Sequence, residues 1–132
     1  MTSKLILYYS LKGNTKGLLD NTDLKGFDVI NINNQNVNLN EYDVILIGTS
    51  TYGRGVPPKP FFKIVGDLKS LSDKKIGLFG SGRSEYEYFC GALDLIEELV
   101  NDQNKILFKF KFEGYPRDKD IQEFNKLLKG VE

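Results

Sequence analysis

Five short runs of apolar residues punctuate the chain, and each has the length of a β-strand rather than that of a helix. These runs are Leu5–Tyr9, Phe27–Ile32, Val44–Ile47, Ile76–Phe79 and Ile106–Phe112. The middle runs are apolar at consecutive positions, which is typical of parallel strands covered on both faces. In the last run, Lys109 and Lys111 alternate with aromatic residues. The pattern predicts five strands.

Amphipathic helical patterns fill most of the segments between these runs. They extend from Asn14 or Thr15 through Leu19, from Pro60 to Leu68, from Ala92 to Val100, and from Asp118 or Asp120 to Leu128. Pro60 suits the first turn of a helix, and Gly130 suits the end of one. The asparagine-rich segment Asn31 to Asn40 is too short for a full helix and predicts a polar loop. Strands that alternate with helices predict a doubly wound α/β domain.

The composition narrows the chemistry that such a domain can carry. The chain has 132 residues, so we expect a single domain over 1–132. It contains no histidine, which excludes a Ser-His-Asp triad, a Cys-His dyad and a His-ligated zinc site built from this chain alone. Lys plus Arg and Asp plus Glu are both 18, and this balance argues against a general nucleic-acid or anionic-membrane binder.

The cysteine content and the lengths of the apolar runs indicate the cellular compartment of the protein. The single cysteine forms no internal disulfide, which fits a reducing environment. No apolar run approaches the roughly 18 residues of a membrane span, and Met1 to Lys4 leads straight into a strand without a signal-peptide core. We therefore expect a cytoplasmic protein with no membrane and no nucleic-acid partner.

The candidate chemistry lies just after the strands, because parallel sheets bind ligands beyond the carboxyl ends of their strands. After the first strand, the segment Ser10-Leu11-Lys12-Gly13-Asn14-Thr15 places two hydroxyls and an amide at the start of a helix. Backbone N–H groups and the helix dipole favour an anion there. The segment is neither a Walker A loop nor a Gly-x-Gly-x-x-Gly turn. It predicts a phosphate site, and an ordinary capped turn is the alternative.

Two further loops combine glycines with aromatic residues. They are Gly48 to Gly55 after the third strand and Gly80 to Gly91 after the fourth. Glycines let a backbone approach a ligand closely, and exposed loop aromatics can stack on a ring. Loop packing is the simpler explanation for any single tyrosine. Together the three loops indicate a flat, ring-shaped ligand with a phosphate tail.

These loops resemble those of a known family. The segment Phe79 to Ala92, with its run Tyr-Glu-Tyr-Phe-Cys-Gly, resembles the flavin-binding loop of short-chain flavodoxins. Ser10 to Thr15 resembles the family's phosphate loop, usually Ser-x-Thr-Gly-Asn-Thr, and Ser50 to Gly53 resembles its Ser/Pro-Thr-Trp/Tyr-Gly loop. The resemblance covers nearly the whole chain. It implies strand order 2-1-3-4-5, helices on both faces, and flavin mononucleotide (FMN) bound where the strand order reverses.

The resemblance also implies roles for individual residues. Ser10, Asn14 and Thr15 correspond to phosphate ligands, together with backbone N–H groups from Leu11 to Thr15. The whole cofactor-binding set implied is Ser10, Leu11, Lys12, Gly13, Asn14, Thr15, Ser50, Thr51, Tyr52, Gly53, Arg54, Ser81, Gly82, Arg83, Tyr86, Tyr88, Phe89 and Cys90. No residue is implied as a catalyst or a metal ligand.

Around the flavin ring the implied roles are more specific. Tyr86 corresponds to the tyrosine on the outer face of the ring, and Tyr52 to the inner-face aromatic. The peptide of Gly53 corresponds to the one that turns over toward N5–H of the one-electron-reduced flavin. Gly82 and Arg83 correspond to backbone contacts with the pyrimidine end.

The chain departs from the family pattern in its charges. Lys12 replaces a usual threonine, Arg83 replaces a frequent aspartate, and the formal net charge is zero where flavodoxins are usually acidic. Positive charge beside an anionic reduced flavin predicts a less negative second reduction potential. Asp94, Glu98 and Asp102 recur every four residues, as either a solvated helix face or a docking surface for a redox partner.

The function implied is that of a monomeric, low-potential electron carrier with bound FMN, and not of an enzyme. It would shuttle single electrons from a flavodoxin or ferredoxin reductase to acceptor enzymes. The alternative is a flavodoxin-like activator of manganese ribonucleotide reductase that uses reduced FMN. A phosphate- or nucleotide-binding module without redox activity also stays open. A response-regulator receiver does not fit, since Tyr9-Ser10 and Gly48-Thr49 replace its acidic residues.

Overall fold

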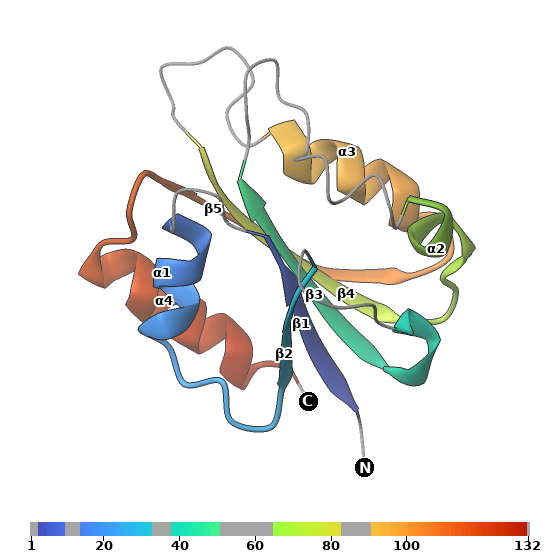
Figure 1. The fold of residues 1–132 in the computed structure, drawn as a ribbon, viewed down its shortest axis with the longest axis horizontal. Helices are drawn as coiled ribbons and strands as arrows, with labels where there is room; N and C mark the ends of the chain where they lie inside the picture. Colours follow the sequence, from blue (N-terminus) through green and yellow to red (C-terminus); the bar gives the residue numbers. More distant parts are fainter. Residues whose placement is uncertain (1–2, 10–13, 33–37, 51–64, 83–90, 132) are drawn as a thin grey trace.

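The fold alternates strands and helices along the chain (Figure 1). The computed structural model describes residues 3–9, 14–32, 38–50, 65–82 and 91–131. Its elements are β1 (Lys4–Tyr8), α1 (Asn14–Asp20), β2 (Asp28–Asn31), η1 (Leu39–Glu41), β3 (Val44–Ser50), α2 (Val65–Ser70), β4 (Lys75–Gly82), α3 (Gly91–Val100), β5 (Lys105–Glu113) and α4 (Asp118–Lys129). Between β2 and β3 the described residues hold only the short 3-10 turn η1, in line with the prediction that no full helix fits there.

The five strands form one parallel sheet in the order β2-β1-β3-β4-β5. The chain passes outward from β1 to β2 and then returns to the other side of β1 to form β3. The strand order therefore reverses between β1 and β3, which is the place where open parallel sheets bind ligands. The predicted doubly wound sheet and its strand order are confirmed.

Helices cover both faces of the sheet, with α1 and α4 on one side and α2 and α3 on the other (Figure 1). Alternate side chains of the central strands supply the two cores. Ile6 and Leu46 pack on the α4 side with Phe124, whereas Leu7 and Ile47 pack on the α3 side with Ile96. Burial on both faces explains why the middle strands read as continuous apolar runs.

The strand β5 lies at an edge of the sheet and contains a β-bulge. Ile76 pairs with Ile106, but Gly77 pairs with Phe108, so Leu107 has no counterpart in β4. Leu107 and Phe108 both pack on the α4 side as a result. Beyond the bulge, Lys109 and Lys111 bond carboxylates of α3 on the other face. Lysines on an edge strand also disfavour pairing with a second molecule.

Some element ends differ from the prediction. Strands β3 and β4 continue to Ser50 and Gly82, beyond Ile47 and Phe79. The ladder persists because Gly48, Thr49 and Ser50 pair with Phe79, Gly80 and Ser81 across the sheet. Apart from Phe79, these residues are glycines or carry small polar side chains, so hydropathy does not mark this part of the two strands. Of the helix expected from Pro60, only α2 lies within the described residues.

No helix within the described residues combines the length and the hydropathy that a membrane span requires.

Candidate functional site

The carboxyl ends of β1, β3, β4 and β5 meet at one edge of the sheet. The backbone N–H of Tyr9 donates to the carbonyl of Gly48 at 3.1 Å, which joins the ends of β1 and β3. The N–H of Gly114 donates to the carbonyl of Gly82 at 3.2 Å, which joins the ends of β5 and β4. The first turn of α1 lies against the ends of β3 and β4. This edge is where the strand order predicts a ligand.

Buried polar groups concentrate at the same edge. In the described part of the chain only four polar or charged residues are buried, and Thr15, Thr49 and Ser81 are three of them. The Thr15 hydroxyl donates from Oγ1 to the carbonyl oxygen of Thr49 at 3.1 Å. Thr15 Oγ1 also lies 3.5 Å from Ser81 Oγ. Polar groups stay buried only where they find such partners, so this cluster is a built feature of the fold.

Glycines allow the strand ends to approach one another closely. A Cβ on Gly80 would overlap the carbonyl oxygen of Thr49, which is the oxygen that Thr15 bonds. A Cβ on Gly48 would overlap the ring of Phe79 on the paired strand. Glycine at these two positions therefore keeps the ends of β3 and β4 in register beside α1.

An exposed aromatic ring packs on α1 from the segment that follows β5. Tyr115 follows β5 and Gly114, whose φ is +64°, and it is 61% exposed. Its ring lies on Gly17 of α1, where an added Cβ would come within 2.5 Å of the ring. Sequence reasoning missed Tyr115 and Thr49 as neighbours of the site. The available signals were a glycine inside the predicted first helix and a polar residue at the end of a buried strand.

The charges near α1 are compatible with an anion at its start. The first turn of α1 contains no acidic residue. Lys16 of this turn bonds Asp20 at 3.0 Å on the exposed side of the helix. The hydrogen bond and the negative charge of Asp20 raise the pKa of Lys16, so Lys16 stays positive at neutral pH.

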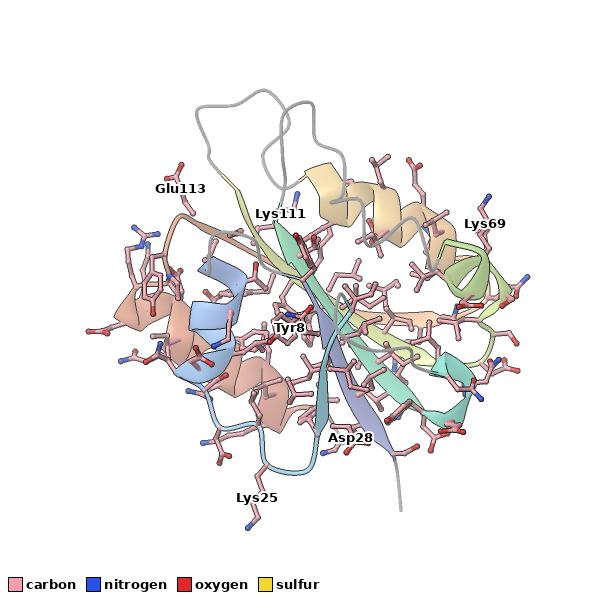
Figure 2. The ribbon with its side chains drawn as sticks, viewed as in Figure 1. Tyr8, Lys25, Asp28, Lys69, Lys111 and Glu113 are labelled. Atoms are coloured by element: carbon pink, nitrogen blue, oxygen red, sulfur yellow. The ribbon has the colours of Figure 1, made fainter. Side chains whose placement is uncertain are left out.

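A second group of charges lies between α3 and β5. Lys109 Nζ bonds Asp94 Oδ1 at 2.7 Å and Glu97 Oε1 at 2.9 Å, and Lys111 Nζ lies 3.5 Å from Asp94 Oδ1. Figure 2 shows Lys111 beside the first turn of α3. Burial opposes ionisation of Asp94, but the bonds and charges of the two lysines outweigh it and lower the pKa of Asp94. Asp94 thus bonds two lysines within the molecule while half of its side chain stays exposed to solvent.

The structure brings together those predicted site residues that it describes. Asn14 and Thr15 begin α1, Ser50 ends β3, and Ser81 and Gly82 end β4, all at the same edge. The other predicted site residues lie outside the described residues, and they are Ser10, Leu11, Lys12, Gly13, Thr51, Tyr52, Gly53, Arg54, Arg83, Tyr86, Tyr88, Phe89 and Cys90.

Comparisons with known proteins agree with this geometry. The sequence model of the family described as Flavodoxin matches residues 6–123. A flavodoxin of Maridesulfovibrio salexigens is 33% identical and covers 92% of each chain. The crystal structure of oxidised flavodoxin 1 from Bacillus cereus has a TM-score of 0.87, with 24% identity over 99% of each chain.

A further structural match includes a ligand in its description. It is a Fusobacterium nucleatum flavodoxin bound to flavin mononucleotide, with a TM-score of 0.78, 15% identity, and coverage of 99% of this chain and 97% of that one. At this identity the match supports the fold alone. The extent of the family match and the identity to the Maridesulfovibrio protein go further: this chain belongs to the flavodoxin family.

Proposed function

We propose that the chain binds FMN at the edge formed by the start of α1 and the ends of β3 and β4, and that it carries single electrons between redox proteins of the cytoplasm. The observation that carries the proposal is a buried polar cluster beside the reversal of strand order, in which the hydroxyls of Thr15 and Ser81 meet the backbone carbonyl of Thr49. Membership of the flavodoxin family supports the choice of ligand.

The described residues fit a phosphate-bearing flavin. The start of α1 carries no acid, so its helix dipole favours an anion. Gly82 lies at the end of β4, where a backbone without a side chain lets a flat ring approach. Asn14 and Thr15 would hold the phosphate end, and Ser50, Ser81 and Gly82 would adjoin the ribityl chain and ring.

FMN and the protein would have separate roles at this edge of the sheet. FMN, when bound, supplies the electron-transfer chemistry, and the protein supplies binding, orientation and exclusion of water. The buried Thr15 and Ser81 keep water from the base of the site, since both side chains are almost fully enclosed. We further propose that electrons arrive from a reductase and leave to acceptor enzymes, with the chain acting as a monomeric carrier. The alternative role, activation of a manganese ribonucleotide reductase, gains no support from the matches.

Flavin binding provides the first test. Purified apoprotein is titrated with FMN and, separately, with riboflavin, and flavin fluorescence quenching yields a Kd for each. We expect FMN to bind much more tightly, because riboflavin lacks the phosphate. Failure to bind either flavin would refute the proposal, and equal Kd values would refute recognition of the phosphate by the start of α1.

Electron transfer is tested with the FMN-loaded protein. Stepwise reduction with dithionite, followed by visible absorption, should resolve two one-electron potentials. A flavodoxin reductase with its reduced nicotinamide cofactor should then reduce the protein, and the reduced protein should pass electrons to a one-electron acceptor such as cytochrome c. A protein that binds FMN but takes no electrons from any such donor would argue against the carrier role.

A further inference from the structure

The carbonyl of Thr49 is held from two sides at the end of β3. Thr15 Oγ1 donates to it at 3.1 Å, and Gly80 of the paired strand lies so close that a Cβ there would overlap the same oxygen. Ser81 follows Gly80, and its Oγ lies 3.5 Å from Thr15 Oγ1. Residues 34 and 66 positions apart in the sequence therefore meet at one buried point.

The donors in this cluster can be assigned from hydroxyl chemistry. A carbonyl oxygen only accepts, so the proton of the Thr15 hydroxyl is directed to Thr49. A hydroxyl has one proton but two lone pairs, so Thr15 Oγ1 faces Ser81 as an acceptor. The hydroxyls thus form a directed chain from Ser81 through Thr15 to the Thr49 carbonyl. This chain crosses from β4 to α1 and on to β3.

We infer that Ser81 is a positioning residue of the FMN site and acts through Thr15. This chain of hydrogen bonds holds the start of α1 against the ends of the two strands that lead toward the ring. The start of α1 would hold the phosphate. This inference rests on the proposed FMN binding. It differs from the role that the family resemblance implies for Thr15, which is to act on the phosphate by itself.

Burial makes the loss of either hydroxyl costly. Thr15 has no exposed surface and Ser81 is 3% exposed, so water cannot replace a lost partner at either hydroxyl. An intramolecular hydrogen bond contributes about 0.5–1.5 kcal/mol, and tenfold in Kd corresponds to about 1.4 kcal/mol. Without either hydroxyl the start of α1 is no longer held in place, and FMN must restore its position on binding. The lost free energy then appears in the Kd for FMN, which should rise by about two- to tenfold.

The test uses a double-mutant cycle on the full chain. Thr15→Val and Ser81→Ala are made singly and together, and Ser81→Cys serves as a second variant that retains the side-chain volume. Thr15→Ser keeps the hydroxyl and should restore parental behaviour. Thr22→Val is the matched control, because Thr22 also donates a hydroxyl hydrogen bond to backbone carbonyls of α1, but at the far end of the helix. Thr22 Oγ1 lies 3.1 Å from the carbonyl oxygen of Leu18 and 3.2 Å from that of Leu19.

Three measurements are made on each variant. They are the Kd for FMN by fluorescence quenching, the visible circular dichroism of FMN at saturation, and the urea unfolding of the apoprotein. We expect Thr15→Val and Ser81→Ala each to raise the Kd and to alter the dichroism of the bound flavin. The Kd of the double variant should exceed the higher of the two single-variant Kd values by less than about twofold, because both changes break the same chain of hydrogen bonds. Thr22→Val should lower apoprotein stability and leave both flavin readouts at the parental values.

The outcomes separate this inference from the proposed function. If Thr15→Val weakens FMN binding while Ser81→Ala and Ser81→Cys bind like the parent, Thr15 acts on the ligand alone and the inference is overturned. Additive single effects would overturn it as well. A parent protein that binds no FMN would instead refute the proposed function, and with it any role of the chain in that site.

Discussion

At the scale of single residues, Gly80 shows how one missing side chain can shape the site. It lies in β4 opposite Thr49, and the backbone carbonyl oxygen of Thr49 fills the space that a Cβ on Gly80 would need. The clash would be with a backbone oxygen rather than with a movable side-chain tip. Relief would require the ends of β3 and β4 to move apart at the point where Thr15 joins them.

We therefore predict that Gly80→Ala lowers the free energy of unfolding of the apoprotein by about 1–3 kcal/mol, the usual cost of overpacking. Gly66→Ala in α2 is the control, because no atom of the described residues lies within 4 Å of the added Cβ. That change should raise stability by about 0.5–1 kcal/mol, since alanine favours a helix. Urea unfolding of the two variants measures both effects, and a shift of the same sign in both would contradict the close approach at Gly80.

At the scale of elements, Lys109 connects edge strand β5 to α3 through two carboxylates. The hydrogen bonds that Lys109 donates to Asp94 and Glu97 raise the pKa of Lys109 despite its partial burial. The bulge at Leu107 places Lys109 on this face, because it shifts every later residue of β5 by one position. The ion pairs thus depend on a backbone irregularity in the strand.

This connection predicts a specific pH dependence. The pKa of Asp94 is lowered in the folded state, so its contribution to stability is complete above its unfolded pKa and is lost as the pH falls through its folded pKa. Half of the Asp94 side chain is exposed, and solvent screening limits the expected effect to about 1 kcal/mol or less. Asp94→Asn should lower the free energy of unfolding near neutral pH and much less in acid, at a pH below the lowered pKa of Asp94.

Urea unfolding at the two pH values provides this measurement. Glu98→Gln, on the exposed side of the same helix, removes an equal charge and is the control. A destabilisation of Asp94→Asn that persists unchanged in acid would show that the ion pairs are not its cause.

The helix α4 is anchored by one aromatic side chain. Phe124 has no exposed surface, and its ring centroid lies 4.9 Å from that of Phe79 and 5.7 Å from that of Phe110. We predict that Phe124→Ala lowers the free energy of unfolding by about 3–5 kcal/mol through loss of burial and formation of a cavity. Phe124→Leu should cost clearly less, because it keeps most of the apolar volume. Equal losses in the two variants, measured by urea unfolding, would argue against packing as the source.

At the scale of the whole molecule, the sheet separates two apolar cores, and the site lies where neither core extends. Helices α1 and α4 cover one core, and α2 and α3 cover the other (Figure 1). At the strand ends, the buried polar residues Thr49 and Ser81 stand where the apolar side chains of the two cores stop. A ligand there contacts α1, β3 and β4 together and should stabilise the molecule as a unit.

We predict that FMN raises the thermal unfolding temperature in a concentration-dependent manner, if the proposed function is right. Free FMN at 100 times its Kd should add about 2.7 kcal/mol, because it binds only the folded chain. Riboflavin at the same concentration should add less. Differential scanning calorimetry across an FMN series measures this, and an unfolding temperature that ignores FMN would contradict the prediction.

The sequence by itself determined the elements and their class. The apolar runs located all five strands, since residues buried on both faces must be apolar. The three loops after the first, third and fourth runs pointed to the edge at which we propose that FMN binds. Their residue types carried the family resemblance, which implied the strand order that the sheet adopts.

The tertiary structure alone decided how these parts meet. The ends of β3 and β4 run on through Ser50 and Gly82 because pairing across the sheet does not depend on side-chain hydropathy. The bulge at Leu107 arises from the pairing of β5 with β4, which no local pattern encodes. Ser81 and Thr15 come together only because parallel strands bring distant segments to one edge. Contacts of this kind depend on strand register and on close approach in three dimensions. The periodicity of apolar residues along the sequence specifies neither.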